Sequence, residues 1–399
     1  MPLIVYIFAV SAFALGLAEF VPIGLTDVLA RSLHVNVEHA GAAVTLYALG
    51  ATFAAPVLTA LTAGWTRRRT MLVTVLVFTV GSLVAAVAND LPTVLAARFV
   101  AGMGHGLFLA VASSTAARMV GPQRAGRAVA VVFGGFTIAL AVGVPISTYL
   151  GRMASSGPVL GAIAAFGAVG LAGLFFGMKE PPKTLQHEGS NSVGQALKAM
   201  FHPVLLFATL VTVLGYAGSF TAFTYIAPLL TDVTGVSAAT VGVFMLVYGV
   251  LAAIGNVIGG NLTDRLGADK ASVVVLAGIA VTSLGIWAFV SSVLAMGIFV
   301  ALLGMFSYAA VPALQARLIG VAEQHAPHAH SVAAGLNIAG FNSGIALGSV
   351  LGGMTIGVAG LAYTGIAGAG VAFLGLLVLL AQMARNRDVV LRKVSGSGH

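Results

Sequence analysis

Twelve long apolar runs, separated by short polar breaks, constrain this chain more than any other feature of its sequence. A helix that crosses a membrane needs about 20 mostly apolar residues. Only 8% of the residues are charged, whereas a soluble domain carries about a quarter, so most of the surface cannot face water. The sequence therefore predicts an all-α polytopic membrane protein. Its spanning helices are expected at 3–26, 40–63, 71–88, 92–116, 126–150, 157–178, 202–228, 238–262, 271–290, 293–319, 331–356 and 360–384.

The distribution of Lys and Arg predicts how the chain is oriented. Loops on the cytoplasmic side of a membrane are enriched in these residues. With a cytoplasmic N-terminus, sixteen of the nineteen fall in inner loops or the C-terminal tail, Arg31 and Arg152 fall outside, and Arg98 falls within a span. Both termini are therefore expected in the cytoplasm, with the first run kept as a helix and not cleaved as a signal peptide. The net charge of +8 then reflects topology, and no nucleic-acid partner is expected.

The two halves of the chain repeat each other at an offset near 200 residues. LTDV at 25–28 recurs at 230–233, and the intramembrane Tyr47 matches Tyr248. Internal repeats of this kind are typical of transporters built from two bundles around a midplane site. The expected domains are an N-terminal six-helix bundle (1–178), a cytoplasmic linker (179–200), a C-terminal six-helix bundle (201–385) and a cytoplasmic tail that ends in tag-like residues (386–399).

Four segments carry a resemblance to a known family. They are AEFVPIGL at 18–25, AARFVAGMGHGLF at 96–108, GVPISTYLG at 143–151 and GLNIAGFNSGIALGSVLGG at 335–353. With them the chain resembles the major facilitator superfamily, and within it the bacterial drug:proton antiporters of the sugar (arabinose-type) and purine-nucleoside efflux subgroup. The resemblance implies twelve helices in two pseudo-symmetric six-helix bundles in a bacterial inner membrane.

Two motifs of that superfamily have partial matches. The loop motif is GNLTDRLGADK, where an acid at a helix end could latch the inner gate; a charged turn that obeys the positive-inside rule is the alternative. Ala63 stands in place of the acid in the first half. The antiporter motif of the fifth helix is split here; it suggests close backbone packing near the bundle interface, and an ordinary kinked helix is the alternative. The residues concerned are Gly260, Asp264, Arg265, Gly267 and Lys270 for the gate, and Gly143 and Pro145 for the antiporter motif.

Glu19 lies in the middle of the first apolar run. A charge at that depth costs at least about 2.5 kcal/mol, so such residues usually face the bundle interior and belong to a pathway or a proton relay. Helical rise places Glu19 and Arg98 at a similar depth in the outer half of the membrane, and the resemblance implies that their two helices are neighbours. Burial favours the neutral acid while the arginine favours the charged acid, which suits a proton carrier. A fixed structural ion pair is the alternative.

Two further titratable residues fall near this pair. Asp27 lies two turns further out, as a second relay or a solvated helix end. His105 lies two turns deeper than Arg98, as a proton carrier or a hydrogen-bonded packing residue. No metal site is expected.

Aromatic and amide side chains within the spans suggest a binding surface for sugars, nucleosides or flat amphiphiles. Packing in the core or against lipid is the alternative for each aromatic residue alone. The residues are Phe20, Tyr47, Phe136, Tyr216, Phe220, Phe223, Tyr225, Tyr248, Tyr308, Asn337 and Asn342.

Together these features predict a monomeric, proton-coupled exporter of small polar or amphipathic compounds that works by alternating access. A purine-nucleoside exporter and a passive uniporter or importer on the same fold remain alternatives. The sequence has no Gly-x-x-x-x-Gly-Lys-Ser/Thr loop for ATP and no nucleophile–base or metal constellation at membrane depth. We therefore expect no enzyme activity and no cofactor, with protons as the coupling ion.

Overall fold

The structure, a computed structural model, describes residues 2–62, 65–120, 125–153, 156–178, 201–325 and 330–396. Within these residues it contains helices and no strand. The first half consists of α1 (Leu3–Gly24), α2 (Thr26–Ser32), α3 (Val37–Leu61), α4 (Arg67–Val87), α5 (Leu91–Val120), α6 (Ala125–Ile138), η2 (Ala139–Gly143), α7 (Val144–Met153) and α8 (Ser156–Gly177). The second half consists of α10 (Pro203–Phe223), α11 (Ile226–Pro228), η4 (Leu229–Val233), α12 (Ala238–Leu266), α13 (Ala268–Ala288), α14 (Val293–His325), α15 (His330–Ala359), η6 (Leu361–Tyr363) and α16 (Thr364–Gly396).

Each of the twelve predicted spans coincides with a helix, so the predicted fold class is confirmed. In the described part of the chain, ten helices are long and apolar enough to cross a membrane. The two remaining spans are occupied by α3 and α5. Two spans are composite: α6, η2 and α7 follow one another without a break, and α10 is followed, after a two-residue turn, by α11 and η4.

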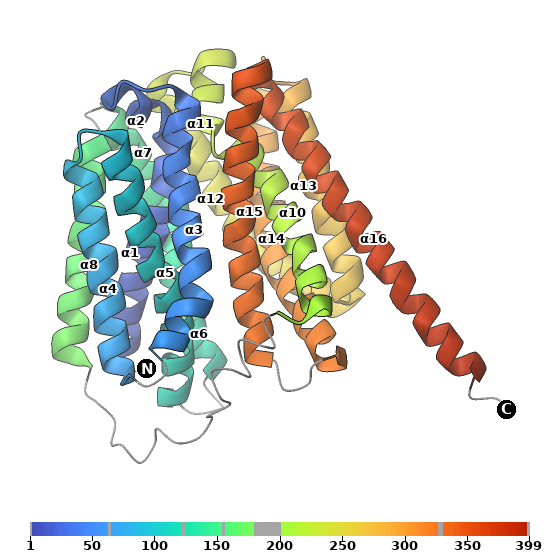
Figure 1. Cartoon of the computed structure of the whole chain (residues 1–399). Helices are drawn as coiled ribbons and strands as arrows, with labels where there is room; N and C mark the ends of the chain where they lie inside the picture. Colours follow the sequence, from blue (N-terminus) through green and yellow to red (C-terminus); the bar gives the residue numbers. More distant parts are fainter. Residues whose placement is uncertain are drawn as a thin grey trace.

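The helices form two bundles that stand side by side (Figure 1). The N-terminal bundle contains α1 to α8 and the C-terminal bundle contains α10 to α16. Between the bundles, α3 packs against α15, and η2 and α7 pack against α12. Glycines allow this approach: Gly249 of α12 lies against the backbone of Leu140 and Ala141, where a Cβ would collide. The expected linker at 179–200 lies outside the described residues.

The first helix of each bundle breaks near one end, and the repeated LTDV sequence follows the break. Pro22 lies inside α1, and a proline weakens the local helix because it has no N–H to donate. The chain then turns at Leu25, and Thr26 donates to the carbonyl oxygen of Pro22 at 2.9 Å. In the second half the chain turns at Tyr225 between α10 and α11. We call the end of the molecule that holds α2 and η4 the upper end, and the end where α1 begins and α16 finishes the lower end (Figure 1).

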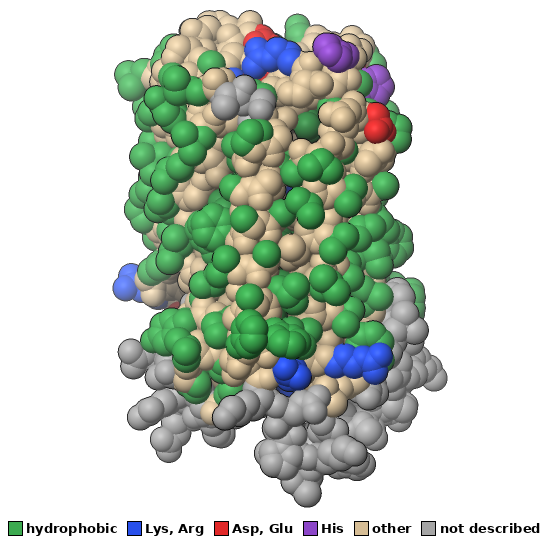
Figure 2. All heavy atoms as spheres, turned by 90° about the vertical axis from the view of Figure 1, so that its left-hand side faces the viewer, with side chains coloured by type: hydrophobic (Ala, Val, Ile, Leu, Met, Phe, Trp, Pro, Cys, Tyr) green, Lys and Arg blue, Asp and Glu red, His purple; other side chains and the backbone are tan. Residues whose placement is uncertain are grey.

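The sides of the molecule are apolar, as lipid contact requires. Figure 2 shows hydrophobic side chains over the full height of one face, with most charged side chains near its upper and lower ends. Large apolar residues such as Val257 and Phe176 are exposed. Polar and charged side chains are instead buried inside the bundles, and these define the candidate site.

Candidate functional site

Glu19 is buried in the N-terminal bundle, as the sequence predicts for a charge at this depth. It is 2% exposed, and neither carboxylate oxygen has a hydrogen-bond partner among the described residues. The nearest side chain that can carry a positive charge is His105 of α5, whose Nδ1 lies 3.8 Å from Glu19 Oε2. A buried acid without fixed partners is costly for stability, and it is free to exchange a proton or to bind a ligand.

Arg98 lies beside Glu19 but does not form the expected ion pair with it. Its Nη1 donates to the carbonyl oxygen of Ala18 at 2.6 Å, and its Nε donates to that of Ala43 at 3.2 Å. The guanidinium also lies 4.2 Å from the centre of the Tyr47 ring. Arg98 therefore ties α1, α3 and α5 together. Their similar depth and the neighbouring helices implied by the resemblance placed the two residues together, but the guanidinium donates to backbone carbonyl oxygens and not to the carboxylate.

His105 links Glu19 to Tyr47. Its Nδ1 lies 3.1 Å from Tyr47 Oη, and Tyr47 donates to the carbonyl oxygen of Leu15 at 3.4 Å. With that hydroxyl proton directed to Leu15, Tyr47 can accept a hydrogen bond from a protonated Nδ1. The histidine is thus hydrogen-bonded, as expected for a packing residue, and it also lies next to the acid.

Aromatic rings from both bundles meet at Phe20, one residue after Glu19. The centre of the Phe20 ring lies 5.6 Å from that of Phe136, 6.3 Å from that of Tyr308 and 6.5 Å from that of Phe220. In the C-terminal bundle Phe223 stacks on Tyr248 with centres 3.8 Å apart. These predicted residues come from α1, α6, α10, α12 and α14, so the structure brings them together at the bundle interface.

Phe341 is part of this cluster but was missed by sequence reasoning. It packs edge-to-face on Tyr216 at 4.4 Å and lies near Phe220. A signal was present, because the Gly-Phe pair at 135–136, which contains Phe136, recurs at 340–341.

The two predicted asparagines have different surroundings. Asn337 accepts a hydrogen bond from Thr212 at 3.0 Å and donates to Gln315 at 2.8 Å, so it joins α10, α14 and α15. Asn342 donates to the carbonyl oxygen of Ile338, and its Oδ1 has no partner among the described residues. The hydroxyl of Tyr308 is likewise buried and without a partner there. Asn342, Tyr308 and Glu19 are therefore the better candidates for ligand contact.

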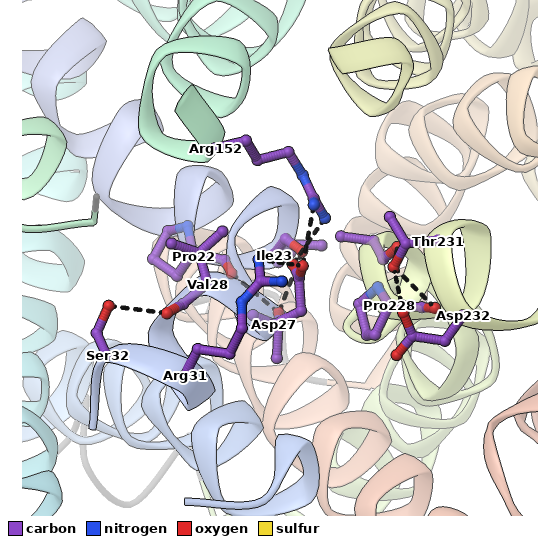
Figure 3. Close-up of polar contacts among 12 residues, drawn as sticks. Pro22, Ile23, Asp27, Val28, Arg31, Ser32, Arg152, Pro228, Thr231 and Asp232 are labelled. Carbon is purple, nitrogen blue, oxygen red and sulfur yellow. Dashed lines mark hydrogen bonds and ion pairs between the residues drawn. The ribbon is translucent and has the colours of Figure 1, made fainter. Parts of the chain in front are cut away.

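A second polar cluster closes the upper end (Figure 3). Asp27 of α2 accepts two hydrogen bonds from Arg152 of α7, at 2.9 and 2.7 Å, and a third from Arg31 at 3.1 Å. Only 9% of the Asp27 side chain and 1% of the Arg152 side chain are exposed. A solvated helix end, one of the two roles considered for Asp27, is therefore wrong. The acid is buried by an arginine 125 residues away, which no local pattern reveals.

Hydrogen bonds also connect the two bundles at this end. Thr26 donates to the carbonyl oxygen of Thr224 at 3.0 Å. Tyr225 donates to the carbonyl oxygen of Ser349 at 2.9 Å and lies 3.4 Å from that of Glu38 in the other bundle. Tyr225, predicted as a substrate contact, thus belongs to the upper contact between the bundles.

Comparison with known proteins identifies the family. The family model described as Major Facilitator Superfamily matches residues 8–326 and 210–396. The chain belongs to the major facilitator superfamily. It is 38% identical over 356 residues to the MFS-type transporter YtbD of Bacillus subtilis, covering 89% of each chain. It is 33% identical over 382 residues to the inner membrane transport protein YdhP of Escherichia coli K12, covering 95% of each. A chloramphenicol efflux pump of Mycobacterium tuberculosis is 30% identical over 357 residues, 87% of this chain and 84% of the pump.

Solved structures show the same fold. The nucleoside transporter NupG superposes with a TM-score of 0.74 at 13% identity, over 96% of this chain and 98% of NupG. The xylose transporter XylE of E. coli, in a partially occluded inward-open conformation, gives 0.72 at 14% identity, over 95% and 96%. As a member of the superfamily with 38% identity to one MFS-type transporter, the chain is a multi-pass membrane transporter and not an enzyme.

The superfamily's loop motif does not form the expected contacts. Asp264, Arg265 and Lys270 are exposed, and Asp264 makes no hydrogen bond or ion pair with any described residue. Gly267 ends α12 with φ of +80°, a conformation that suits glycine because it lacks a Cβ. Gly260 has open space where a Cβ would lie. Ala63, at the matching position of the first half, lies outside the described residues.

A different acid of the same loop is engaged. Asp269 accepts a hydrogen bond from Arg317 Nε at 3.0 Å, and Arg317 Nη2 donates to Gln382 at 2.6 Å. Gln382 in turn donates to the carbonyl oxygen of Phe207 at 2.7 Å. This chain of bonds holds α13, α14, α16 and α10 together inside one bundle. The spacing of the motif did not predict this contact, because spacing does not reveal which carboxylate faces an arginine.

The antiporter motif of the superfamily lies where the fifth span meets its neighbours. Gly143 ends the π-helical segment η2 and packs against Leu17 and Phe13 of α1. The carbonyl oxygen of Pro145, two residues on, faces Gly242 of α12. π-helical turns are frequent at functional sites. Close packing near the bundle interface, one of the two roles considered for this motif, is therefore what the structure contains.

Proposed function

We propose that the protein is a proton-coupled antiporter that exports small polar or amphipathic compounds by alternating access. Within the superfamily we assign it to the drug:proton antiporters of the sugar (arabinose-type) and purine-nucleoside efflux subgroup. It works as a monomer in a bacterial inner membrane, with both termini in the cytoplasm and the upper end outside. Protons are its coupling ion, and it uses no other cofactor.

The observation that carries this proposal is the isolated, buried Glu19. Its carboxylate has no hydrogen-bond partner among the described residues, and His105 lies 3.8 Å away. The aromatic interface between the bundles begins at the next residue, Phe20, which contacts rings of both bundles. A proton bound at Glu19 thus sits at the edge of the surface that would bind the substrate. Competition between proton and substrate at such a place couples their opposite movements.

The upper cluster supports alternating access. The described hydrogen bonds between the bundles, from Thr26 to Thr224 and from Tyr225 toward Glu38, lie at the upper end. An exporter must break these contacts to release its substrate outside and remake them afterward. The aromatic cluster at the bundle interface indicates the substrate class. Its ring faces suit a compound with a flat apolar face, and the free acceptor oxygens of Glu19 and Asn342 suit several hydroxyl or amine donors on that compound. The named activity of the mycobacterial relative adds chloramphenicol to the sugars and nucleosides worth testing.

Glu19→Gln tests the proposal because it keeps shape and hydrogen bonding but removes the titrating group. In inverted vesicles we expect substrate counterflow, which needs no net proton movement, to stay within about twofold of the parent. Uptake driven by a pH gradient should fall to the level of vesicles without a gradient. Glu323→Gln, which changes an exposed glutamate near the end of α14, should leave both activities unchanged. A folded Glu19→Gln protein that still concentrates substrate would refute the proton-carrier role, and parent vesicles that equilibrate substrate without concentrating it would favour a passive uniporter.

A further inference from the structure

An open apolar groove of about 470 Å³ runs along the outside of the N-terminal bundle between α4 and α8. Its walls are apolar side chains of the two helices, among them Leu72, Leu76, Leu171 and Phe175. Leu76, Phe175 and Phe176 are exposed, Phe176 by 82%. Because the groove lies on the side of a membrane protein, what covers it in the membrane is lipid. The transport site described above does not use these residues.

Two arginines stand at the lower end of this groove. Arg68 Nη2 donates to the carbonyl oxygen of Phe175 at 2.8 Å, and its guanidinium lies 5.6 Å from the centre of that ring. Arg69 lies over the ring of Trp65 at 4.3 Å. Neither arginine is ion-paired with a carboxylate in the part of the chain that the structure describes. Figure 2 shows Lys and Arg side chains at the lower rim of this apolar face.

We propose that the groove binds an anionic phospholipid, with an acyl chain between α4 and α8 and the phosphate on Arg68 and Arg69. Guanidinium groups match phosphate oxygens in geometry and charge. The arginines lie in the first turn of α4, whose N-terminal N–H groups also favour an anion. The bond from Arg68 to Phe175 holds the positive charge next to the apolar wall of the groove. One lipid can therefore contact the arginine with its phosphate and the wall with its acyl chain. The alternative is a non-specific attraction between basic loops and anionic headgroups, and that attraction would not depend on the groove.

A second groove of the molecule provides the contrast. It has a similar volume, about 530 Å³, and lies between α4 and α5 toward the upper end, with Val84 and Thr93 among its lining residues. The residue at its mouth is acidic: Asp90 accepts a hydrogen bond from the Thr93 N–H at 2.9 Å, and this bond lowers the pKa of Asp90. A negative carboxylate repels an anionic headgroup. By shape, both grooves could hold an acyl chain. Only the lower groove has arginines at its end, so only this groove is expected to select anionic lipids.

The two tryptophans of the chain allow a direct test. Trp287→Phe leaves Trp65, beside Arg69, as the single tryptophan, which can be excited selectively. The full-length protein is placed in nanodiscs of zwitterionic lipid, and a growing fraction is replaced by brominated phosphatidylglycerol or brominated phosphatidylcholine. We expect half-maximal quenching of Trp65 at a lower mole fraction of the anionic lipid than of the zwitterionic lipid. The expected difference is about fivefold for each arginine that binds the phosphate, which corresponds to ~1 kcal/mol per basic residue near the membrane.

Arg68→Gln and Arg69→Gln should each move the anionic curve toward the zwitterionic one. Lys270→Gln, which removes an exposed charge at the start of α13, should not move it. The ratio of the two curves cancels any change in the brightness of Trp65 itself. Equal quenching by both lipids in the parent would overturn the proposal.

A variant that fills the groove separates a built site from simple charge attraction. Ala172 is exposed and lines the groove, so Ala172→Phe occupies the space without changing charge. Native mass spectrometry should then find several-fold fewer phosphatidylglycerol molecules retained per protein, as for Arg68→Gln. Ala96→Phe, at an exposed alanine of the second groove, should leave this number unchanged. Undiminished retention in a folded Ala172→Phe protein would overturn the groove as the binding place.

Discussion

Two asparagines five residues apart on α15 illustrate how strongly a role depends on the immediate neighbours. Asn337 has both its oxygen and its nitrogen bonded to side chains of other helices, Thr212 and Gln315. Asn342 bonds only within its own helix and leaves a buried oxygen free. The first is a structural tie within the C-terminal bundle. The second, close to Phe341 in the aromatic cluster, is available to a substrate.

This contrast predicts opposite effects of the same substitution. Asn337→Ala leaves Thr212 and Gln315 without partners and should lower the free energy of unfolding by about 1–3 kcal/mol. Asn342→Ala should change that free energy little, because it removes an unpaired oxygen, but should raise the KM for export severalfold. Thermal unfolding of the purified proteins and transport in inverted vesicles measure the two quantities. A destabilised Asn342→Ala with normal KM would contradict the assignment.

At the scale of the element, the loop between α12 and α13 separates two acids that the sequence motif does not distinguish. Asp269 binds Arg317, which is itself tied to Gln382. Asp264 is exposed and has no bond to a described residue. With the bundles in contact at the upper end, the loop's acid Asp264 stands free at the lower end. It remains available to latch that end in the opposite state of the transport cycle.

Substitution of each acid by asparagine should therefore affect a different property: the stability of the fold for Asp269 and the rate of the transport cycle for Asp264. Asp269→Asn weakens a half-exposed ion pair and should cost roughly 1 kcal/mol of stability. Asp264→Asn should leave stability unchanged but slow transport, because it removes the latch of the lower-closed state. Unfolding midpoints and transport rates, measured side by side, decide the matter. Normal transport by Asp264→Asn would remove this acid from the gate.

At the scale of the whole molecule, the cluster of Asp27, Arg31 and Arg152 lies within the N-terminal bundle, next to the hydrogen bond from Thr26 to Thr224 that joins the two bundles. Arg152 is buried and bonded twice to Asp27, whereas Arg31 bonds to the same acid from an exposed position. Asp232 of the C-terminal bundle lies across from this pair (Figure 3). Removal of a buried partner costs about 3–5 kcal/mol, and removal of an exposed one costs at most about 1 kcal/mol.

Arg152→Gln removes the buried partner of Asp27, whose neighbour Thr26 bonds to Thr224 of the other bundle. We therefore expect this variant to open the upper end, and Arg31→Gln to leave it closed. The chain has no native cysteine, so spin labels can be attached at Asn36→Cys and Ala239→Cys, which are exposed on opposite bundles at this end. Pulsed electron spin resonance should report a longer distance in a larger share of molecules for Arg152→Gln. Unchanged distance distributions in both variants would mean that Asp27 and Arg152 stabilise the fold of one bundle without gating it.

The sequence by itself determined the fold class, the twelve helical segments, the division into two related halves and the burial of Glu19. These follow from hydropathy along the chain, because a bilayer forces every long apolar run into a helix and every charge within it toward the bundle interior. The tertiary structure alone decided which polar groups meet: Arg98 with the carbonyl oxygens of Ala18 and Ala43, His105 with Glu19, and Asp27 with Arg152. The physical reason is that such contacts depend on how each helix is rotated and on the rotamer of a long side chain. Both are set by packing between residues far apart in the sequence, which no local pattern contains.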